Sequence, residues 1–384
     1  MQYKNHEILF SGKDLMATFI DANSNISVII FNGKSKILNN GRYVPFNQMP
    51  IMANNVFSPI GINEVHIFPN RANWYQSDEI YNILNIVKSK LKHTRYITYG
   101  SSMGGFAAIN FSKLLNCDFI AFSPQATLQD PFPISSTWEF AKKTYPDFRS
   151  MILDGSCRSS KGLLFFDYKN KTDSYHGMYI KRNTKAKIIN IPFSNHETIR
   201  AINDITRVKY IVKDYLLQTF NLSFFKKNFF DVYKKTPNYI YHIYTRNKLY
   251  DIKAIKEALK IYNDDYKLLF IYGKILYNNK KYQDAYNYLL KSVQLCKQPS
   301  IINYIPIYNT LKKPNRHDSA TKLFENLSIE HYARYGNLFL DYLEQGNTEK
   351  SDEYLLKALS LHPNKIEYMK KLVMIINKKK NSLC

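Results

Sequence analysis

The chain of 384 residues has few cysteines and no long apolar run, the features that mark zinc-binding, disulfide-bonded and membrane-spanning proteins. Its four cysteines are scattered without a CxxC pair, so they indicate neither a zinc site nor a disulfide framework. They are Cys117, Cys157, Cys296 and Cys384. No uninterrupted apolar run approaches the roughly 18 residues of a transmembrane segment, and the first residues lack the pattern of a signal peptide. A cytoplasmic protein is expected, with a peripheral position at the inner membrane as an alternative.

Nucleotide and metal motifs are also missing. The sequence contains no P-loop, no GxGxxG and no cluster of His, Cys and carboxylate residues, so no bound cofactor and no metal are expected. Apolar residues make up 45% of the chain, which excludes global disorder, and its length predicts two or three domains.

Acidic residues are scarce relative to basic ones. Lys and Arg number 54 against 31 Asp and Glu, a formal net charge of +23. The excess is spread along the chain, with 26 basic against 16 acidic residues over 1–220 and 28 against 15 over 221–384. Such a charge attracts polyanions, although an AT-rich genome also produces this composition. We expect an acidic polysaccharide or another anionic glycan as a partner, and no specific nucleic acid, because no recognition motif accompanies the charge.

Residues 1–220 alternate short apolar runs with longer helical stretches, which predicts an α/β domain with a mostly parallel sheet flanked by helices. The runs predicted as strands are 27–31, 65–68, 96–99, 119–122, 163–166 and 187–193. The stretches predicted as helices are 78–91, 104–115, 174–182 and 197–217. Residues 126–161 break the alternation and are expected to form an excursion over the sheet.

Residues 236–384 are predicted to form an all-helical repeat domain, reached through an aromatic and basic connector over 221–235. One copy of the repeat comprises Leu269, Tyr272, Gly273, Leu276, Ala285, Leu289 and Ser292. A second copy has the same spacings at Tyr335, Leu338, Phe339, Tyr342, Ser351, Leu355 and Ala358, followed by Pro363. Ala320 and Phe324 fit a degenerate copy between them, and Ile255 and Ala258 end an earlier one. The pattern resembles the tetratricopeptide repeat, which implies stacked helix pairs and a protein partner as an alternative to a glycan.

One short motif indicates catalytic chemistry. Residues 100–104 read Gly-Ser-Ser-Met-Gly, with a predicted strand before them and a predicted helix after them. In that setting Gly-x-Ser-x-Gly predicts a sharp turn that holds Ser102 in a strained backbone conformation with its hydroxyl exposed. Ser102 is therefore the expected nucleophile.

A serine nucleophile needs a base and a carboxylate that orients the base. His196 follows the last predicted strand and is the expected base, whereas His176 lies inside a predicted helix and is expected at the surface. Two aspartates could supply the acid. Asp173 lies a few residues beyond a strand, the position that the resemblance named below favours for the acid, although it could instead cap the helix predicted to begin at Ser174. Asp167, at the strand end, remains the alternative.

The oxyanion of the reaction needs backbone donors. The N–H of Met103, next after the nucleophile, is the first expected donor. The loop after the strand 27–31 is expected to supply the second, at Gly33 and Lys34. Three residues after the strand 65–68 could line the substrate pocket or pack in the core. They are Asn73, Trp74 and Tyr75.

With these residues in place, residues 1–220 resemble a serine α/β-hydrolase. The resemblance implies a Ser102–His196–Asp173 triad, or Asp167 as its acid, acting through an acyl-enzyme. The Gly-Ser-Ser-Met-Gly-Gly and Asn-Trp-Tyr sequences are similar to bacterial proteins of this fold associated with surface glycans. Those proteins include capsule O-acetyltransferases and glycan esterases, so acetyl-CoA is the implied acyl donor if the chain is a transferase.

The chain departs from that family in two ways. It has no HGGG-type oxyanion loop, and residues 125–162 do not form a large lipase-like lid. The alternative function is a non-enzymatic tetratricopeptide scaffold that carries a hydrolase-like domain.

Overall fold

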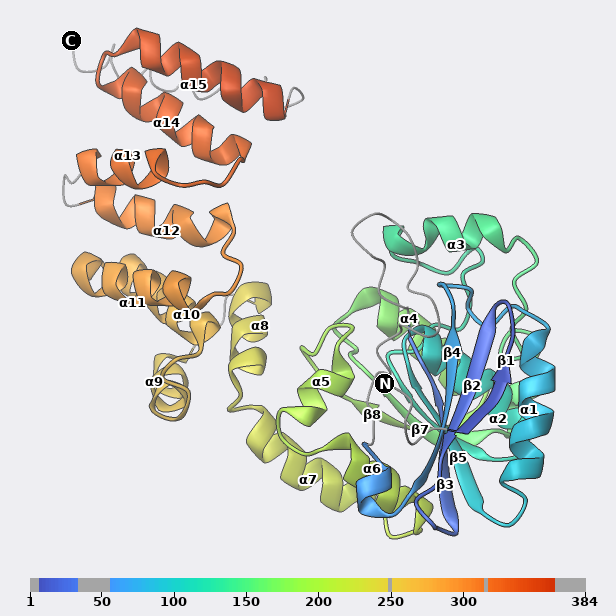
Figure 1. Ribbon diagram of the computed structural model, residues 1–384. Coiled ribbons are helices and arrows are strands. Elements are labelled where there is room, and N and C mark those ends of the chain that lie inside the picture. The colour runs from blue at the N-terminus through green and yellow to red at the C-terminus, as the bar shows by residue number, and fades with distance from the viewer. Residues whose placement is uncertain (1–6, 34–55, 248–250, 314–316, 363–384) are drawn as a thin grey trace. The chain divides into compact units, whose positions relative to one another are not determined.

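The computed structural model describes residues 7–33, 56–247, 251–313 and 317–362 (Figure 1). The chain divides into two compact units, Met1–His242 and Ile243–Cys384. The first is an α/β unit built on one sheet, and the second is entirely helical within the described residues. This confirms the predicted fold class.

The α/β unit contains an eight-stranded sheet in the order β1-β2-β4-β3-β5-β6-β7-β8. The strands are β1 (Glu7–Ser11), β2 (Leu15–Ile20), β3 (Ile26–Phe31), β4 (Asn63–Pro69), β5 (Arg95–Ser101), β6 (Asp118–Phe122), β7 (Lys161–Phe166) and β8 (Lys185–Asn190). β2 alone runs opposite to the other strands of the sheet, so the carboxyl ends of β3 to β8 meet at one edge.

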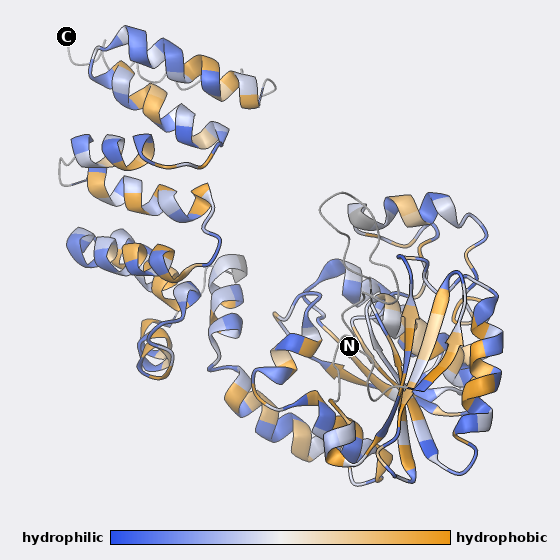
Figure 2. Cartoon of the chain, in the orientation of Figure 1, coloured by the Kyte–Doolittle hydropathy of each residue, from blue (hydrophilic) through white to orange (hydrophobic). Residues whose placement is uncertain are grey.

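Helices cover both faces of the sheet, because its central strands are apolar on both sides. In β3, for example, Ile29 and Phe31 pack on one face and Val28 and Ile30 on the other. The first face is covered by α1 (Glu79–Lys90), α2 (Met103–Leu115) and α4 (Lys171–Arg182). The second is covered by α5 (Thr198–Asn203), α6 (Val208–Leu216) and α7 (Leu222–Tyr233). In Figure 2 the apolar stripes of α1 alternate with polar ones, as this one-sided burial requires.

The six predicted strands are confirmed as β3 to β8, but β1 and β2 were not predicted. The predicted excursion over 126–161 contains α3 (Glu139–Thr144) and packs Phe148 and Ile152 into the core on the first face. The long helix expected over 197–217 is two helices, α5 and α6, separated by a turn.

The connector expected over 221–235 is also different in the structure. Most of it forms α7, and its Phe229 and Tyr233 are buried in the core on the second face of the sheet. The aromatic residues that suggested a linker therefore complete the α/β unit. Helix α8 (Pro237–Asn247) follows, and the division between the two units falls within it.

The helical unit is built from hairpins of antiparallel helices. After α9 (Ile252–Ile261) come the pairs α10 (Tyr266–Asn278) with α11 (Tyr282–Leu295), α12 (Ile301–Lys312) with α13 (His317–Glu325), and α14 (Tyr332–Glu344) with α15 (Thr348–Leu361). Each pair also contacts the next, through α11 with α12 and α13 with α14. This is a tetratricopeptide-like helical repeat.

Small residues at the predicted repeat positions explain how closely the paired helices approach. A Cβ atom on Gly273 of α10 would lie 2.7 Å from Cγ of Leu289 on α11, closer than carbon atoms can pack. Ala285 and Ser292 of α11 are fully buried, as are Ser351 and Ala358 of α15 to within 2%. Pro363 lies outside the described residues. No helix in the described ranges is both long and apolar enough to cross a bilayer.

Candidate active site

Ser102 stands at the turn between β5 and α2, where the motif predicts it. Its backbone has φ 55° and ψ −118°, a conformation that residues with a side chain rarely adopt. The backbone N–H of Ser102 donates to the carbonyl of Phe122 at the end of β6, at 2.9 Å, and its carbonyl accepts from Phe106 of α2, at 3.0 Å. These two hydrogen bonds, one to β6 and one to α2, hold Ser102 in its strained backbone conformation.

The glycines of the motif are required by close approach of the backbone. A Cβ atom on Gly100 would lie 2.1 Å from the carbonyl oxygen of Gly104, and one on Gly104 would lie 2.1 Å from that of Phe31. Both positions admit only hydrogen. Because the end of β3 is packed directly against Gly104, Asn32 and Gly33, which follow β3, lie beside the turn that carries Ser102.

His196 brings an imidazole to Ser102 from the loop after β8. Its Nε2 lies 2.8 Å from Oγ of Ser102, and its Nδ1 lies 2.8 Å from Oδ1 of Asp173. The structure thus brings together the expected base, the expected nucleophile and the preferred aspartate. Since a carboxylate only accepts hydrogen bonds, Nδ1 carries the proton and Nε2 is free to accept the hydroxyl proton of Ser102.

Asp173 occupies the first turn of α4 and is 1% exposed. It does not cap that helix: α4 begins at Lys171, three residues earlier than predicted, and the cap is Asn170, whose Oδ1 accepts the N–H of Asp173 at 3.1 Å. Its Oδ2 is buried without a hydrogen-bond partner, so His196 is its one side-chain partner among the described residues.

The electrostatics of His196 favour its protonated form. Burial by itself lowers the pKa of His196, but the hydrogen bond and negative charge of Asp173, aided by the charge of Glu197, outweigh burial and raise the pKa above the usual 6.5. The side chain of His196 remains 40% exposed, while that of Asp173 is covered. An imidazole with this environment can take a proton from Ser102 and hold it as an ion pair with Asp173.

Asp167 does not contact His196 and instead shapes its loop. One carboxylate oxygen accepts the N–H of Lys169 at 2.8 Å, and the other accepts the N–H of Asn195 at 2.9 Å. Asn195 has φ 53° and directly precedes His196. Asp167 therefore fixes the backbone that presents the imidazole, a role that its position at a strand end does not reveal.

His176 is buried, contrary to the surface position expected for it. It is 0% exposed, its Nδ1 accepts the N–H of Ala126 at 3.1 Å, and its Nε2 donates to the carbonyl of Pro133 at 2.8 Å. Burial lowers its pKa below the usual 6.5, so it stays neutral and ties the excursion to α4. The spacing of three residues between Asp173 and His176 was the available signal, because it places both on the buried face of one helix.

Two of the expected oxyanion donors, Met103 and Gly33, lie near Ser102. Met103 is the first residue of α2, where a backbone N–H has no partner within the helix. Gly33 lies next to the turn, since a Cβ atom on it would be 3.9 Å from the carbonyl oxygen of Ser101. Lys34 lies outside the described residues.

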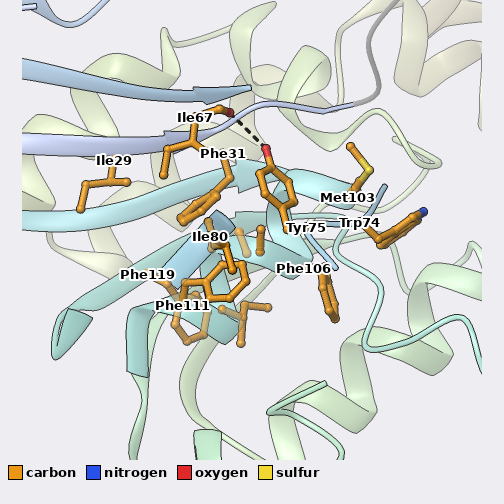
Figure 3. Close-up of a cluster of buried hydrophobic side chains, with 14 of the residues drawn as sticks. Ile29, Phe31, Ile67, Trp74, Tyr75, Ile80, Met103, Phe106, Phe111 and Phe119 are labelled. Carbon is orange, nitrogen blue, oxygen red and sulfur yellow. Dashed lines mark hydrogen bonds between the residues drawn. The ribbon is translucent and has the colours of Figure 1, made fainter. Parts of the chain in front are cut away.

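Asn73, Trp74 and Tyr75 are all buried, with exposed fractions of 0 to 2%. Trp74 packs edge-on against Phe106 of α2 and Trp138 of the excursion, and Tyr75 lies deep in the same cluster, as Figure 3 shows. Of the two roles expected for these residues, the structure shows packing in the core. No group of three His, Cys, Asp or Glu that could bind a metal occurs among the described residues.

Comparisons with solved structures find similarity to esterases. Est1E from Butyrivibrio proteoclasticus, solved with bound ferulic acid, is 14% identical, with the match covering 56% of this chain and 98% of that one at a TM-score of 0.39. The Pyrococcus furiosus esterase Pf2001 is 16% identical over 53% of this chain and 85% of that one, at a TM-score of 0.35.

Other solved structures that are similar to the chain are tetratricopeptide proteins. YrrB, described as having an unusual peptide-binding site, is 20% identical over 45% of this chain and 96% of that one, at a TM-score of 0.32. No protein-family model matches the chain, and no curated protein sequence matches it. The fold itself rests on the eight-stranded, mostly parallel sheet flanked by helices and on the tetratricopeptide-like helix pairs described above.

Proposed function

We propose that the chain is a serine-dependent acyl-ester enzyme, an esterase or an O-acyltransferase. The observation that carries the proposal is the chain of two hydrogen bonds, each 2.8 Å long, from Ser102 through His196 to Asp173. It lies at a strand-to-helix turn with a strained serine, the arrangement that activates a hydroxyl nucleophile.

In the proposed mechanism, Oγ of Ser102 attacks the carbonyl carbon of the ester while its proton passes to Nε2 of His196. The negative charge that develops on the carbonyl oxygen is stabilised by the N–H groups of Met103 and Gly33. The tetrahedral intermediate then expels the alcohol, which takes the proton from His196, and the acyl group remains on Ser102. Asp173 stabilises the imidazolium throughout without accepting its proton.

The second half of the reaction runs the same chemistry with a new nucleophile. His196 removes a proton from water or from a sugar hydroxyl, and that oxygen displaces Ser102 from the acyl group. With water as the acceptor the protein is an esterase, and with a sugar hydroxyl it is an O-acyltransferase. In the second case acetyl-CoA is the acyl donor, so Ser102 attacks a thioester and the group expelled in the first half is the thiol of coenzyme A.

For the substrate we propose an acidic surface polysaccharide, such as capsule. The net charge of +23 supports a polyanionic substrate, because it raises the local concentration of a polyanion by long-range attraction. The helical repeats are proposed to recruit a partner, either the glycan or a protein. A glycan held by charge requires that activity on the acidic polymer fall with added salt while activity on a neutral ester does not.

The test is trapping with a fluorophosphonate probe, followed by assays on acetylated and non-acetylated glycans. We expect the wild-type chain to be labelled at Ser102 and to hydrolyse 4-nitrophenyl acetate, and Ser102→Ala to do neither while melting at the wild-type temperature. Near-normal turnover by Ser102→Ala would exclude the serine mechanism. A wild-type chain that neither labels nor turns over an ester would favour the scaffold function.

A further inference from the structure

Two adjacent core residues have a backbone conformation that is costly for bulky side chains. Trp74 has φ 52° and Tyr75 has φ 57°, both in the left-handed region. The side chain of Asn73 supports the turn, since its Oδ1 accepts the N–H of Tyr75 at 2.9 Å and its Nδ2 donates to the carbonyl of Asp14 at 3.2 Å. Strain of this kind persists where surrounding structure enforces it, and it is concentrated near functional sites.

The turn directs the side chain of Tyr75 to the carboxyl ends of β3 and β4. The ring lies edge-on to Phe31, with centroids 5.3 Å apart. The hydroxyl lies 2.7 Å from the carbonyl oxygen of Asn32 and 3.2 Å from that of Ile67, the second contact being drawn in Figure 3. The Ile67 oxygen already accepts from the backbone and side-chain N–H groups of Asn32, so the single proton of Tyr75 belongs to the closer oxygen, that of Asn32.

That carbonyl shares a peptide unit with the N–H of Gly33. Among the described residues the one cis peptide bond is Asp130–Pro131, so the bond from Asn32 to Gly33 is trans. The C=O and N–H of a trans peptide point in opposite directions. Holding the oxygen of Asn32 against the core therefore turns the N–H of Gly33 out of the core, at a residue that lies beside Ser101 and the nucleophile turn.

We propose that Tyr75 is a positioning residue for the oxyanion hole. Its hydroxyl holds the Asn32–Gly33 peptide so that the N–H of Gly33 is aimed at the oxygen that becomes negative when Ser102 attacks. The inference rests on the proposed acyl-transfer function. Burial raises the pKa of Tyr75 well above its usual range, so the hydroxyl remains a donor throughout the pH range of activity.

The test compares Tyr75→Phe with Tyr96→Phe in the full chain. Both substitutions remove a hydroxyl that donates to a backbone carbonyl, but that of Tyr96 donates to Leu115, at 3.1 Å, near the start of β5 and the end of α2. The readouts are kcat and KM for 4-nitrophenyl acetate, the melting temperature, and the affinity for a trifluoromethyl ketone, whose adduct with Ser102 places an oxyanion in the hole.

Loss of a whole oxyanion donor lowers kcat about 100- to 1000-fold. Because Tyr75→Phe loosens the donor without deleting it, we expect kcat and the affinity for the ketone both to fall roughly ten- to hundredfold with KM unchanged. Tyr96→Phe is expected to leave all three constants unchanged. If Tyr75→Phe behaves like Tyr96→Phe, or only lowers the melting temperature, the positioning role is wrong and the serine mechanism is unaffected.

A second variant covers the case in which Tyr75→Phe does not fold. Gly33→Pro keeps the tyrosine and removes the N–H itself. It should lower kcat and the affinity for the ketone at least as much as a lost oxyanion donor does. Full activity in Gly33→Pro would overturn the inference, whereas absence of activity in the wild-type chain would mean that the proposed function has failed.

Discussion

Replacing each of two aspartates by asparagine separates the carboxylate that orients His196 from the one that holds its loop. Among the described residues, the side-chain hydrogen bond of Asp173 is to the imidazole of His196, whereas Asp167 accepts hydrogen bonds from the backbone N–H groups of Lys169 and Asn195. The two variants are isosteric and each removes one negative charge. Asp173→Asn is expected to lose more activity, and Asp167→Asn is expected to lose more stability.

Asp173→Asn should reduce activity severely and stability little. An amide can present its NH₂ group to Nδ1 of His196, which favours the wrong tautomer and leaves no base for Ser102. In a serine triad such a change lowers kcat by about 10⁴-fold, equivalent to about 5.5 kcal/mol. The amide can keep a hydrogen bond to Nδ1 of His196, so the main cost to folding is the lost interaction of the charge with the start of α4, about 0.3–1 kcal/mol.

Asp167→Asn should have the reverse balance. An amide offers one acceptor oxygen where the carboxylate offers two, so one of the two N–H groups loses its partner and faces an NH₂ group. Loss of a hydrogen bond by a part-buried donor costs about 0.5–1.5 kcal/mol of the free energy of unfolding. Because the loop that carries His196 is loosened but its imidazole still reaches Asp173, we expect activity to fall by roughly tenfold.

The assay measures two quantities on the same preparations. One is the second-order rate of labelling of Ser102 by a fluorophosphonate, and the other is the free energy of unfolding from urea titration. Asp173→Asn should be labelled more slowly than Asp167→Asn, whereas Asp167→Asn should have the lower free energy of unfolding. A larger loss of labelling in Asp167→Asn, with both variants folded, would refute it and would assign the acid to Asp167.

Three further predictions concern other parts of the chain. Since the pKa of His196 is raised and only its neutral form is a base, kcat/KM should rise with pH through a midpoint above the usual 6.5. In Asp173→Asn that midpoint should move to lower pH, and an unmoved midpoint would show that Asp173 does not raise the pKa of His196. Gly104→Ala should lose about 1–3 kcal/mol of stability and most labelling, because its Cβ would lie 2.1 Å from the carbonyl oxygen of Phe31; full labelling would contradict the geometry. Gly273→Ala should lower the melting temperature of the helical unit through contact with Leu289 while labelling of Ser102 is unchanged, and a raised melting temperature would show that α11 can yield.

The local patterns of the sequence determined much of this molecule. Apolar runs between helical stretches were enough to predict β3 to β8, because strands buried on both faces must be apolar throughout. The glycines around Ser102 predicted the turn, since their lack of a side chain is a direct requirement of backbone contact. Repeated small residues such as Gly273 and Ala285 predicted the helical hairpins for the same reason. In each case the constraint restricts the type of residue at positions with a fixed local spacing, so it is visible in the order of the residues.

The long-range pairings were decided only by the tertiary structure. Asp173 and Asp167 both follow β7, and their order along the chain does not reveal which of them meets an imidazole from the loop after β8. His176 was expected at the surface because its partners, Ala126 and Pro133, belong to an irregular segment without a period. The hydroxyl of Tyr75 reaches a peptide 43 residues earlier in the chain. Hydrogen bonds of this kind depend on the directions of individual groups in space, and residue type and spacing do not encode those directions.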